Sequence, residues 1–348
     1  MKKIIVLAIV AVALTIFNGC QKEELVSQLA DEQPQAAVKP DVYVENGYLV
    51  FKDFDTYAKV SDKLDLMSKS EFENWEKEIA FFSAISLLNE VYSKLEIEES
   101  EENYKKIKAE YDGKLFFTSD NDILLPFYAT AWQKVLNPEG EVKIGQTLYK
   151  FFKDREIMIM DGTKNDLLNL DRIISDTTKV KVFYPNKNSL LKSVQWGTLA
   201  STTLEYSNFR LEYSYQLISL YYSGYGYGTT YYTENGFELK HWMRQKRKKI
   251  WWSYNETQYY ITGINLHIEF WKMYEGLNIY PKYVYNQNQA DYTSSETDQG
   301  CTYRFMRYYD VLTGYHPQVI PEIYNNSFTF WSRGFGYNNR KTINYSNQ

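Results

Sequence analysis

Apolar residues in the first half of the chain mostly recur with a helical period. The spacing of Phe54, Tyr57 and Leu64 predicts one helix, and Ser70 with Glu73 forms a capping-box pattern at the start of a longer one. A further pattern ends at Gly113, where a helix is expected to stop. The predicted helices cover residues 54–64, 70–95, 104–111 and 124–136.

Short apolar runs between these helices predict strands. One lies at residues 48–51, and two or three more lie between residues 142 and 159, after the turn signal Asn137-Pro138-Glu139-Gly140. Residues 42–179 are therefore expected to form a mixed α/β N-terminal domain.

The second half changes to a period of two. Leu211, Tyr213, Tyr215 and Leu217 alternate with polar residues, which predicts a strand with one buried and one solvated face. Turns are expected at residues 224–228 and 234–236. Residues 180–348 are accordingly expected to be an antiparallel, β-sandwich-like domain, so the whole chain is α+β. The alternating runs lie at residues 211–217, 237–243, 264–270 and 303–309.

The N-terminus has the zones of an export signal. Lys2 and Lys3 precede an uncharged run, Ile4–Phe17, which is too short for a spanning helix, and Gly19 then stands before Cys20. The sequence predicts a signal peptide over residues 1–19. The polar, proline-containing stretch 20–41 is expected to be a flexible tether.

The residues around the predicted cleavage site resemble a bacterial lipobox. Phe17-Asn18-Gly19-Cys20 departs from the common Leu-Ala-Gly-Cys form in a way that is similar to lipoproteins of the Bacteroidetes. The following Gln21-Lys22-Glu23-Glu24 resembles their acidic surface-export signal. The resemblance implies lipid attachment at Cys20, an outer-membrane anchor and display on the cell surface.

A second resemblance covers roughly residues 45–160. The segments Gly47-Tyr48-Leu49-Val50-Phe51 and Leu136-Asn137-Pro138-Glu139-Gly140, continuing to Phe151, are similar to those of a group of Bacteroidetes lipoproteins with a domain of unknown function. This resemblance implies no particular activity.

Composition narrows the choice of partners. The chain carries 39 basic and 44 acidic residues, and its net charge of −5 argues against nucleic acid as a partner. If Cys20 is acylated, Cys301 has no partner for a disulfide. Stability must then come from a packed core.

Few residues offer chemistry. His267 and Glu269 would share a strand face, but nothing nearby completes a metal site, so a solvated face is the better interpretation. His241 is interpreted as a packing residue, and His316 as a loop residue too uncertainly placed to activate Cys301. Residues 161–166 fail the calcium-loop pattern and predict a polar turn. We therefore expect no catalytic residue, no metal and no cofactor.

Two other features remain. The dense basic run from Arg244 to Lys249 could meet anionic groups, although a solvated hairpin turn is the simpler interpretation. The second half holds 25 of the 33 tyrosines and six of the eight tryptophans, which either fill a sheet or form a platform for ligands. The candidate platform comprises Tyr221, Tyr222, Tyr225, Tyr227, Tyr231, Tyr232, Trp242, Trp251 and Trp252.

These observations favour a surface-anchored, non-enzymatic lipoprotein that binds extracellular glycan or protein. A structural component of the cell envelope is one alternative. A hydrolase that works through two carboxyl groups is another, because such a site leaves little trace in sequence.

Overall fold

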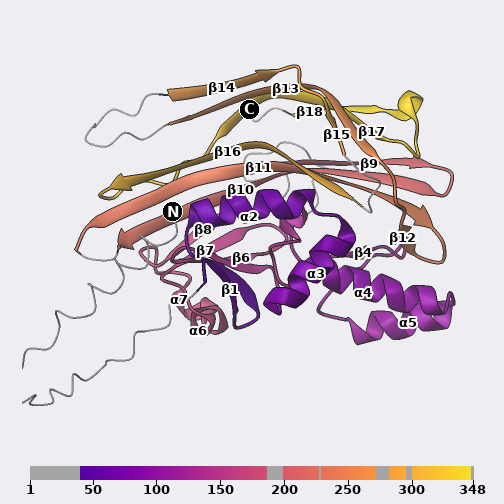
Figure 1. The fold of residues 1–348 in the computed structure, drawn as a ribbon, viewed down its shortest axis with the longest axis horizontal. Helices are drawn as coiled ribbons and strands as arrows, with labels where there is room; N and C mark the ends of the chain where they lie inside the picture. Colours follow the sequence, from indigo (N-terminus) through magenta and orange to yellow (C-terminus); the bar gives the residue numbers. More distant parts are fainter. Residues whose placement is uncertain (1–39, 186–198, 227–228, 272–281, 295–299, 346–348) are drawn as a thin grey trace, which may run out of the picture. The chain divides into compact units, whose positions relative to one another are not determined.

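Strands predominate in the computed structural model, which describes residues 40–185, 199–226, 229–271, 282–294 and 300–345 (Figure 1). The fold is β-rich with some helices, and nearly all of its strand pairs are antiparallel. The predicted signal peptide, Cys20 and the tether lie outside the described residues. No helix among the residues described is both long and apolar enough to cross a membrane.

The helices of the first half partly follow the prediction. The long helix expected from Ser70 to Leu95 is wrong, because Ala80 adopts a left-handed conformation (φ 54°) and separates two helices. Ser68 with Glu71 forms the capping box, and Ser83 caps the next helix. The helices are α2 (Phe54–Leu66), α3 (Lys69–Ile79), α4 (Ala84–Ile97), α5 (Glu101–Glu110), α6 (Lys164–Leu168) and α7 (Leu170–Ile173).

The helix predicted over residues 124–136 is also wrong. This stretch holds the end of a short hairpin, β3 (Phe116–Phe117) with β4 (Ile123–Leu124), and a 3-10 turn, η1 (Thr130–Trp132). The backbone N–H of Tyr128 donates to the carbonyl of Phe152, 3.0 Å away, so it is not available to a helical ladder.

The first half also builds a six-stranded sheet. The pair β2–β5 is parallel and the other pairs are antiparallel. Its last strand, β8, lies beyond the predicted domain boundary at 180, because a turn at Asp176 returns the chain to β7. In order across the sheet the strands are β1 (Val42–Glu45), β2 (Tyr48–Phe51), β5 (Glu141–Ile144), β6 (Thr147–Phe151), β7 (Glu156–Met160) and β8 (Val180–Phe183).

The second half forms two further sheets, and all four predicted alternating runs lie within strands. The first sheet has the strand order β12-β11-β10-β9, and β16 also pairs with β11. Its strands are β9 (Ala200–Tyr206), β10 (Phe209–Tyr225), β11 (Tyr231–Lys248), β12 (Trp252–Tyr254) and β16 (Cys301–Thr313). The second sheet has the strand order β14-β13-β17-β18, and β15 also pairs with β13. Its strands are β13 (Tyr259–Trp271), β14 (Lys282–Asn288), β15 (Tyr292–Thr293), β17 (Glu322–Ser332) and β18 (Lys341–Tyr345). A 3-10 turn, η2 (Tyr337–Asn339), precedes β18.

The turn predicted at residues 234–236 is wrong, since all three lie inside β11. Gly236 is there because the backbone of Tyr308 on β16 passes too close for any side chain. The glycine therefore allows two strands to approach each other.

The two faces of the long β10–β11 ribbon have different partners. One face packs apolar rings against the β13–β17 sheet, with Tyr213 stacked on Phe330 at 4.4 Å between ring centroids. The other face carries most of the ribbon's charged side chains together with apolar ones such as Ile218. It is covered by the first half of the chain, where Gln216 accepts from the backbone N–H of Ala131. The predicted solvated face is thus buried, and the second half is not a free-standing domain.

Buried polar contacts join the halves. Glu238 on β11 accepts from Tyr57 Oη at 2.6 Å and from Trp132 Nε1 at 2.8 Å. Lys240 pairs with Asp65 of α2 at 2.8 Å. The chain from Pro40 onward forms one compact unit.

Candidate functional site

The nine aromatic residues singled out from the sequence differ widely in exposure. Tyr231 and Tyr232 are half-buried, Tyr225 is 65% exposed, and Tyr227 lies outside the described residues. The others are buried, as the stacking of Trp251 on Tyr104 illustrates, and Trp242 among them also lines a pocket. The buried members are Tyr221, Tyr222, Trp242, Trp251 and Trp252.

The basic run is only partly the solvated turn that the sequence suggested. Arg244 and Lys246 lie inside β11 with exposed fractions of 3% and 0%, whereas Arg247 and Lys249 are exposed. The alternation of the strand explains the difference, because every second side chain faces the first half of the chain.

His241 lies beside Cys301, whereas His267 lies on another strand, β13. His241 Nε2 lies 3.9 Å from Cys301 Sγ, but burial lowers the pKa of His241 to about 3, so the ring is neutral and cannot stabilise a thiolate. His267 bonds Glu269 on a partly exposed strand face, at 2.9 Å. Asp166 caps α6 in the turn expected at residues 161–166. No group of three possible ligands for a metal occurs among the residues described.

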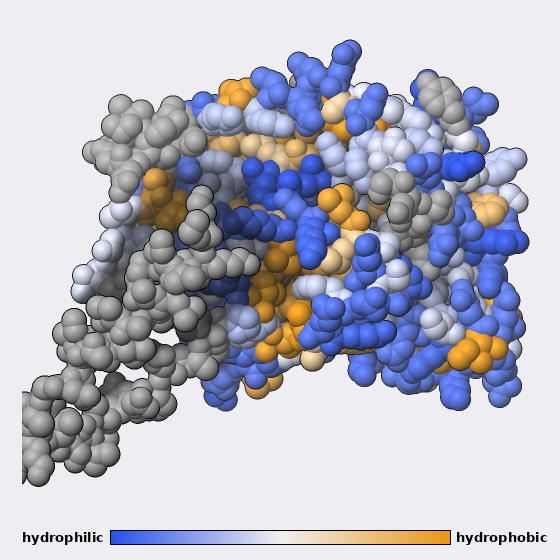
Figure 2. Space-filling model, in the orientation of Figure 1, coloured by the Kyte–Doolittle hydropathy of each residue, from blue (hydrophilic) through white to orange (hydrophobic). Residues whose placement is uncertain are grey.

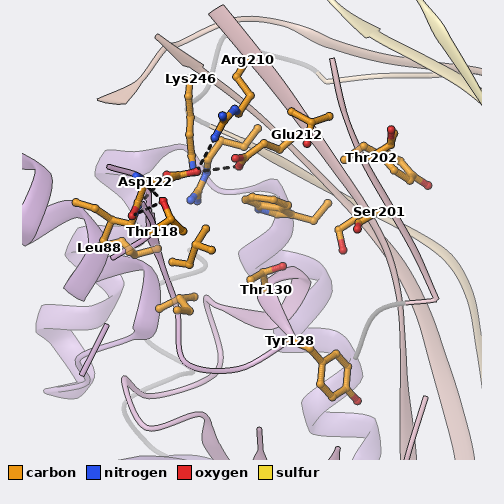
Figure 3. A pocket seen from close by; sticks show the side chains of 18 of the residues that line it. Leu88, Thr118, Asp122, Tyr128, Thr130, Ser201, Thr202, Arg210, Glu212 and Lys246 are labelled. Atoms are coloured by element: carbon orange, nitrogen blue, oxygen red, sulfur yellow. Dashed lines mark hydrogen bonds and ion pairs between the residues drawn. The ribbon is translucent and has the colours of Figure 1, made fainter. Parts of the chain in front are cut away.

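A pocket of about 620 Å³ lies where the first half meets the β9–β10–β11 sheet. The loop around the β3–β4 hairpin contributes Thr118 and Asp122 to one side, and β9 contributes Ser201 and Thr202 to another (Figure 3). Hydroxyl, amide and charged side chains make up much of the wall, and the ring of Trp242 also lines it.

The strand pairing explains how this wall is built. Glu212 on β10 lies opposite Thr203 on β9 and opposite Arg244 on β11, so the three side chains share one face. Arg210 is likewise flanked by Glu205 and Lys246 in the neighbouring row. Residues from three strands are thereby fixed on a rigid surface beneath the pocket.

Two carboxyl groups meet at Lys246. The Nζ of Lys246 lies 2.6 Å from Asp122 and 3.1 Å from Glu212. Burial raises the pKa of Glu212 to about 7; Lys246 opposes this rise, and a hydrogen bond to Asp122 adds to it. Near neutral pH, Glu212 is therefore partly protonated and can act as donor or acceptor.

Arg210 holds the mouth of the pocket together. Its guanidinium lies 2.6 Å from Asp120, 3.2 Å from Asp122 and 2.7 Å from Glu205, and 4.0 Å from the centre of the Trp252 ring. Burial raises the pKa of Asp120, but hydrogen bonds from Thr118 and Arg210 outweigh it and hold this pKa at about 2. Asp120 is thus ionised at the rim.

Sequence reasoning missed Asp122 and Glu212. Asp122 is 88 positions from Arg210 and 124 from Lys246, and Glu212 occupies the face that the alternation assigned to solvent. Only the tertiary fold brings these residues together.

Comparison with known proteins adds little to this geometry. No family model matches the chain, and no curated protein matches it. It is similar to the crystal structure of a DUF4848 family protein from Bacteroides thetaiotaomicron, with 17% identity over 87% of this chain and 98% of that one, and a TM-score of 0.29.

Proposed function

We propose that this protein is a surface-anchored lipoprotein that captures a saccharide in the pocket beside Asp122 and Glu212. The observation that carries the proposal is the chemistry of the wall. Carboxyl, amide and hydroxyl groups stand around a space the size of a small-ligand site. Sugars present many hydroxyl groups, each of which both donates and accepts, and such a wall can satisfy them.

Polar groups in the pocket are held in place before a ligand arrives. Gln216 Nε2 donates to Thr130 Oγ1 at 2.6 Å and to Ser214 Oγ at 2.7 Å, and each hydroxyl keeps its own O–H for another acceptor. Preorganised donors lower the entropic cost of binding.

A small ligand is favoured over a protein partner by the rest of the surface. Large exposed apolar residues are distributed over separate elements, for example Leu66 on α2, Leu168 on α6 and Trp271 on β13. Figure 2 shows hydrophilic groups over most of the face in view, with apolar groups near its centre. A protein partner usually binds through a larger apolar patch than single residues on separate elements provide.

Filling the pocket at Thr203 is expected to weaken saccharide binding at least tenfold without unfolding the protein. Thr203 is exposed on β9, and Thr203→Trp places a bulky ring over the pocket. On a glycan array followed by calorimetry, the native protein should bind a saccharide that the variant binds at least tenfold more weakly. Thr342→Trp, an exposed threonine on β18, is the matched control and should bind normally. Absence of saccharide binding by the native protein would refute the proposal.

The same samples separate capture from hydrolysis. Glu212, partly protonated near pH 7 beside Asp122, could act as a general acid, and this favours the hydrolase as the second candidate. Capture predicts that the bound saccharide is recovered intact. New reducing ends that disappear in Glu212→Gln would establish the hydrolase instead.

We propose lipid attachment at Cys20, with the folded unit outside the cell. The support comes from the order of residues at positions 2–24. Labelling with radioactive palmitate should mark the native chain and be lost in Cys20→Ser. Protease added to intact cells should cut the protein, and survival of the domain while a surface control is cut would contradict display.

A further inference from the structure

Arg244 is the one buried cation on the polar face of the β10–β11 ribbon that has no carboxylate partner within the described part of the chain. Its Nη1 donates to Tyr254 Oη and its Nη2 donates to Gln133 Oε1 at 3.3 Å, and both acceptors are neutral. Its Nε has no hydrogen-bond partner there, and neither has Nε1 of Trp242. The guanidinium lies 4.7 Å from the centre of the Trp242 ring.

Three other cations on the same face do have carboxylate partners. Lys240 pairs with Asp65, Lys246 pairs with Asp122 and Glu212, and Arg210 pairs with three carboxylates. Charges that leave water are normally paired, because an uncompensated buried charge is costly. Arg244 is 3% exposed and lines the pocket, so an anionic ligand bound there would lie beside its guanidinium.

We propose that the pocket takes a saccharide that carries a carboxylate and that Arg244 pairs with it. This inference rests on the proposed function and names the class of ligand. Guanidinium and carboxylate match in planar shape and charge, and their hydrogen bonds are stronger than neutral ones. The O–H groups of Ser214 and Thr130 stand in the same wall and can donate to the sugar or to its carboxylate.

The charges around Arg244 favour a single carboxylate over a multiply charged group. Asp120 and Glu205 stand at the rim with partly exposed side chains and share the one guanidinium of Arg210, so the rim keeps an excess of negative charge that repels anions. A phosphorylated sugar, which carries about two negative charges near neutral pH, would meet that repulsion with more charge than one uncompensated guanidinium can neutralise. A uronic acid carries one carboxylate, and this supplies the single negative charge that pairs with Arg244.

The protonation state of Glu212 should change the affinity of the pocket for an acidic saccharide. Glu212 faces Asp122 from the hairpin loop, Lys246 and Arg244 from β11, Arg210 from its own strand and Thr203 from β9. When Glu212 is protonated, it adds no repulsion to an incoming carboxylate. Binding of an acidic sugar should therefore strengthen as the pH falls from 8 to 6, and binding of a neutral sugar should change less.

The test compares oligosaccharides that contain glucuronic acid with the same oligosaccharides after chemical reduction of the carboxyl to an alcohol. At pH 6.5 the native protein should bind the acidic form about tenfold more tightly, the range expected for a charge-assisted hydrogen bond. In Arg244→Gln the two forms should bind equally. Arg244→Lys should recover part of the preference, and Lys249→Gln, an exposed cation of the same basic run, should keep all of it.

Each outcome decides the matter. Equal binding of the acidic and reduced forms by the native protein overturns the inference and leaves saccharide capture standing. Tighter binding of a sulfated oligosaccharide than of the uronate also overturns it. Failure of every saccharide to bind refutes the proposed function itself. Circular dichroism establishes that each variant is folded, and Arg244→Lys carries the test if Arg244→Gln is not.

Discussion

Replacing Lys246 with methionine is expected to lower the free energy of unfolding by about 3–5 kcal/mol, the cost of breaking a buried ion pair by removing one partner. The Lys246 side chain is 1% exposed and lies between Asp122 and Glu212. Methionine fills a similar volume but leaves two carboxyl groups facing each other. Urea unfolding at pH 8, where Glu212 is mainly ionised, measures the effect.

Lys249→Met is the matched control, three residues along the same basic run. The side chain of Lys249 is 32% exposed, and its ion pair with Glu99 is long, at 3.7 Å. Exposed pairs of this kind contribute less than about 1 kcal/mol. A similar loss in both variants would mean that Lys246 is solvated in solution, as the sequence alone suggested.

The contrast between these lysines shows what hydrophobic alternation can and cannot predict. Alternation correctly predicted strands in β10, β11, β13 and β16, because a period of two follows from strand geometry. It does not say what covers the polar face. Charged residues on a strand usually face water, and here Glu212 and Lys246 face the first half of the chain instead.

Local signals had similar limits in the helices. Apolar residues recur at helical spacing on each side of Ala80, and no glycine or proline between Ser70 and Leu95 marks the turn, so the spacing on its own predicted one continuous helix. The stretch 124–136 is rich in apolar residues because it is packed under the sheet, and burial without regular structure looks like a helix in sequence.

The site was beyond the reach of sequence for a related reason. The abundance of tyrosine pointed to residues 221–232, where Tyr221 and Tyr222 are buried in the core and Tyr231 and Tyr232 are half-buried. The pocket depends instead on Asp122, Glu212 and Arg244, which come from separate segments. No spacing rule joins residues that a sheet face and a distant loop bring together.

Glu238→Gln is expected to destabilise the protein by about 3 kcal/mol at pH 7. Glu238 is fully buried and bonds Tyr57, Trp132 and Arg307. Burial raises the pKa of Glu238, but Lys240 and Arg307 outweigh burial and hold it below its ordinary value of 4.5. The carboxylate is therefore ionised, and its contribution is present above pH 4.5 and lost as the pH falls through the lowered pKa.

Glu156→Gln makes the same substitution at another buried position between the halves. Its effect on stability should change with pH in the opposite direction. Burial raises the pKa of Glu156 well above 4.5, and its carboxyl accepts from Ser219 N at 3.0 Å, a bond that an amide oxygen retains. The contribution of Glu156 to the free energy of unfolding is therefore present below pH 4.5 and is lost as the pH rises towards the raised pKa. Glutamine does not ionise, so the variant does not suffer that loss. Unfolding measured from pH 4 to pH 8 should thus show Glu238→Gln falling further below the native protein, and Glu156→Gln rising relative to it. Parallel trends in the two variants would contradict the opposite charge states on which the buried interface depends.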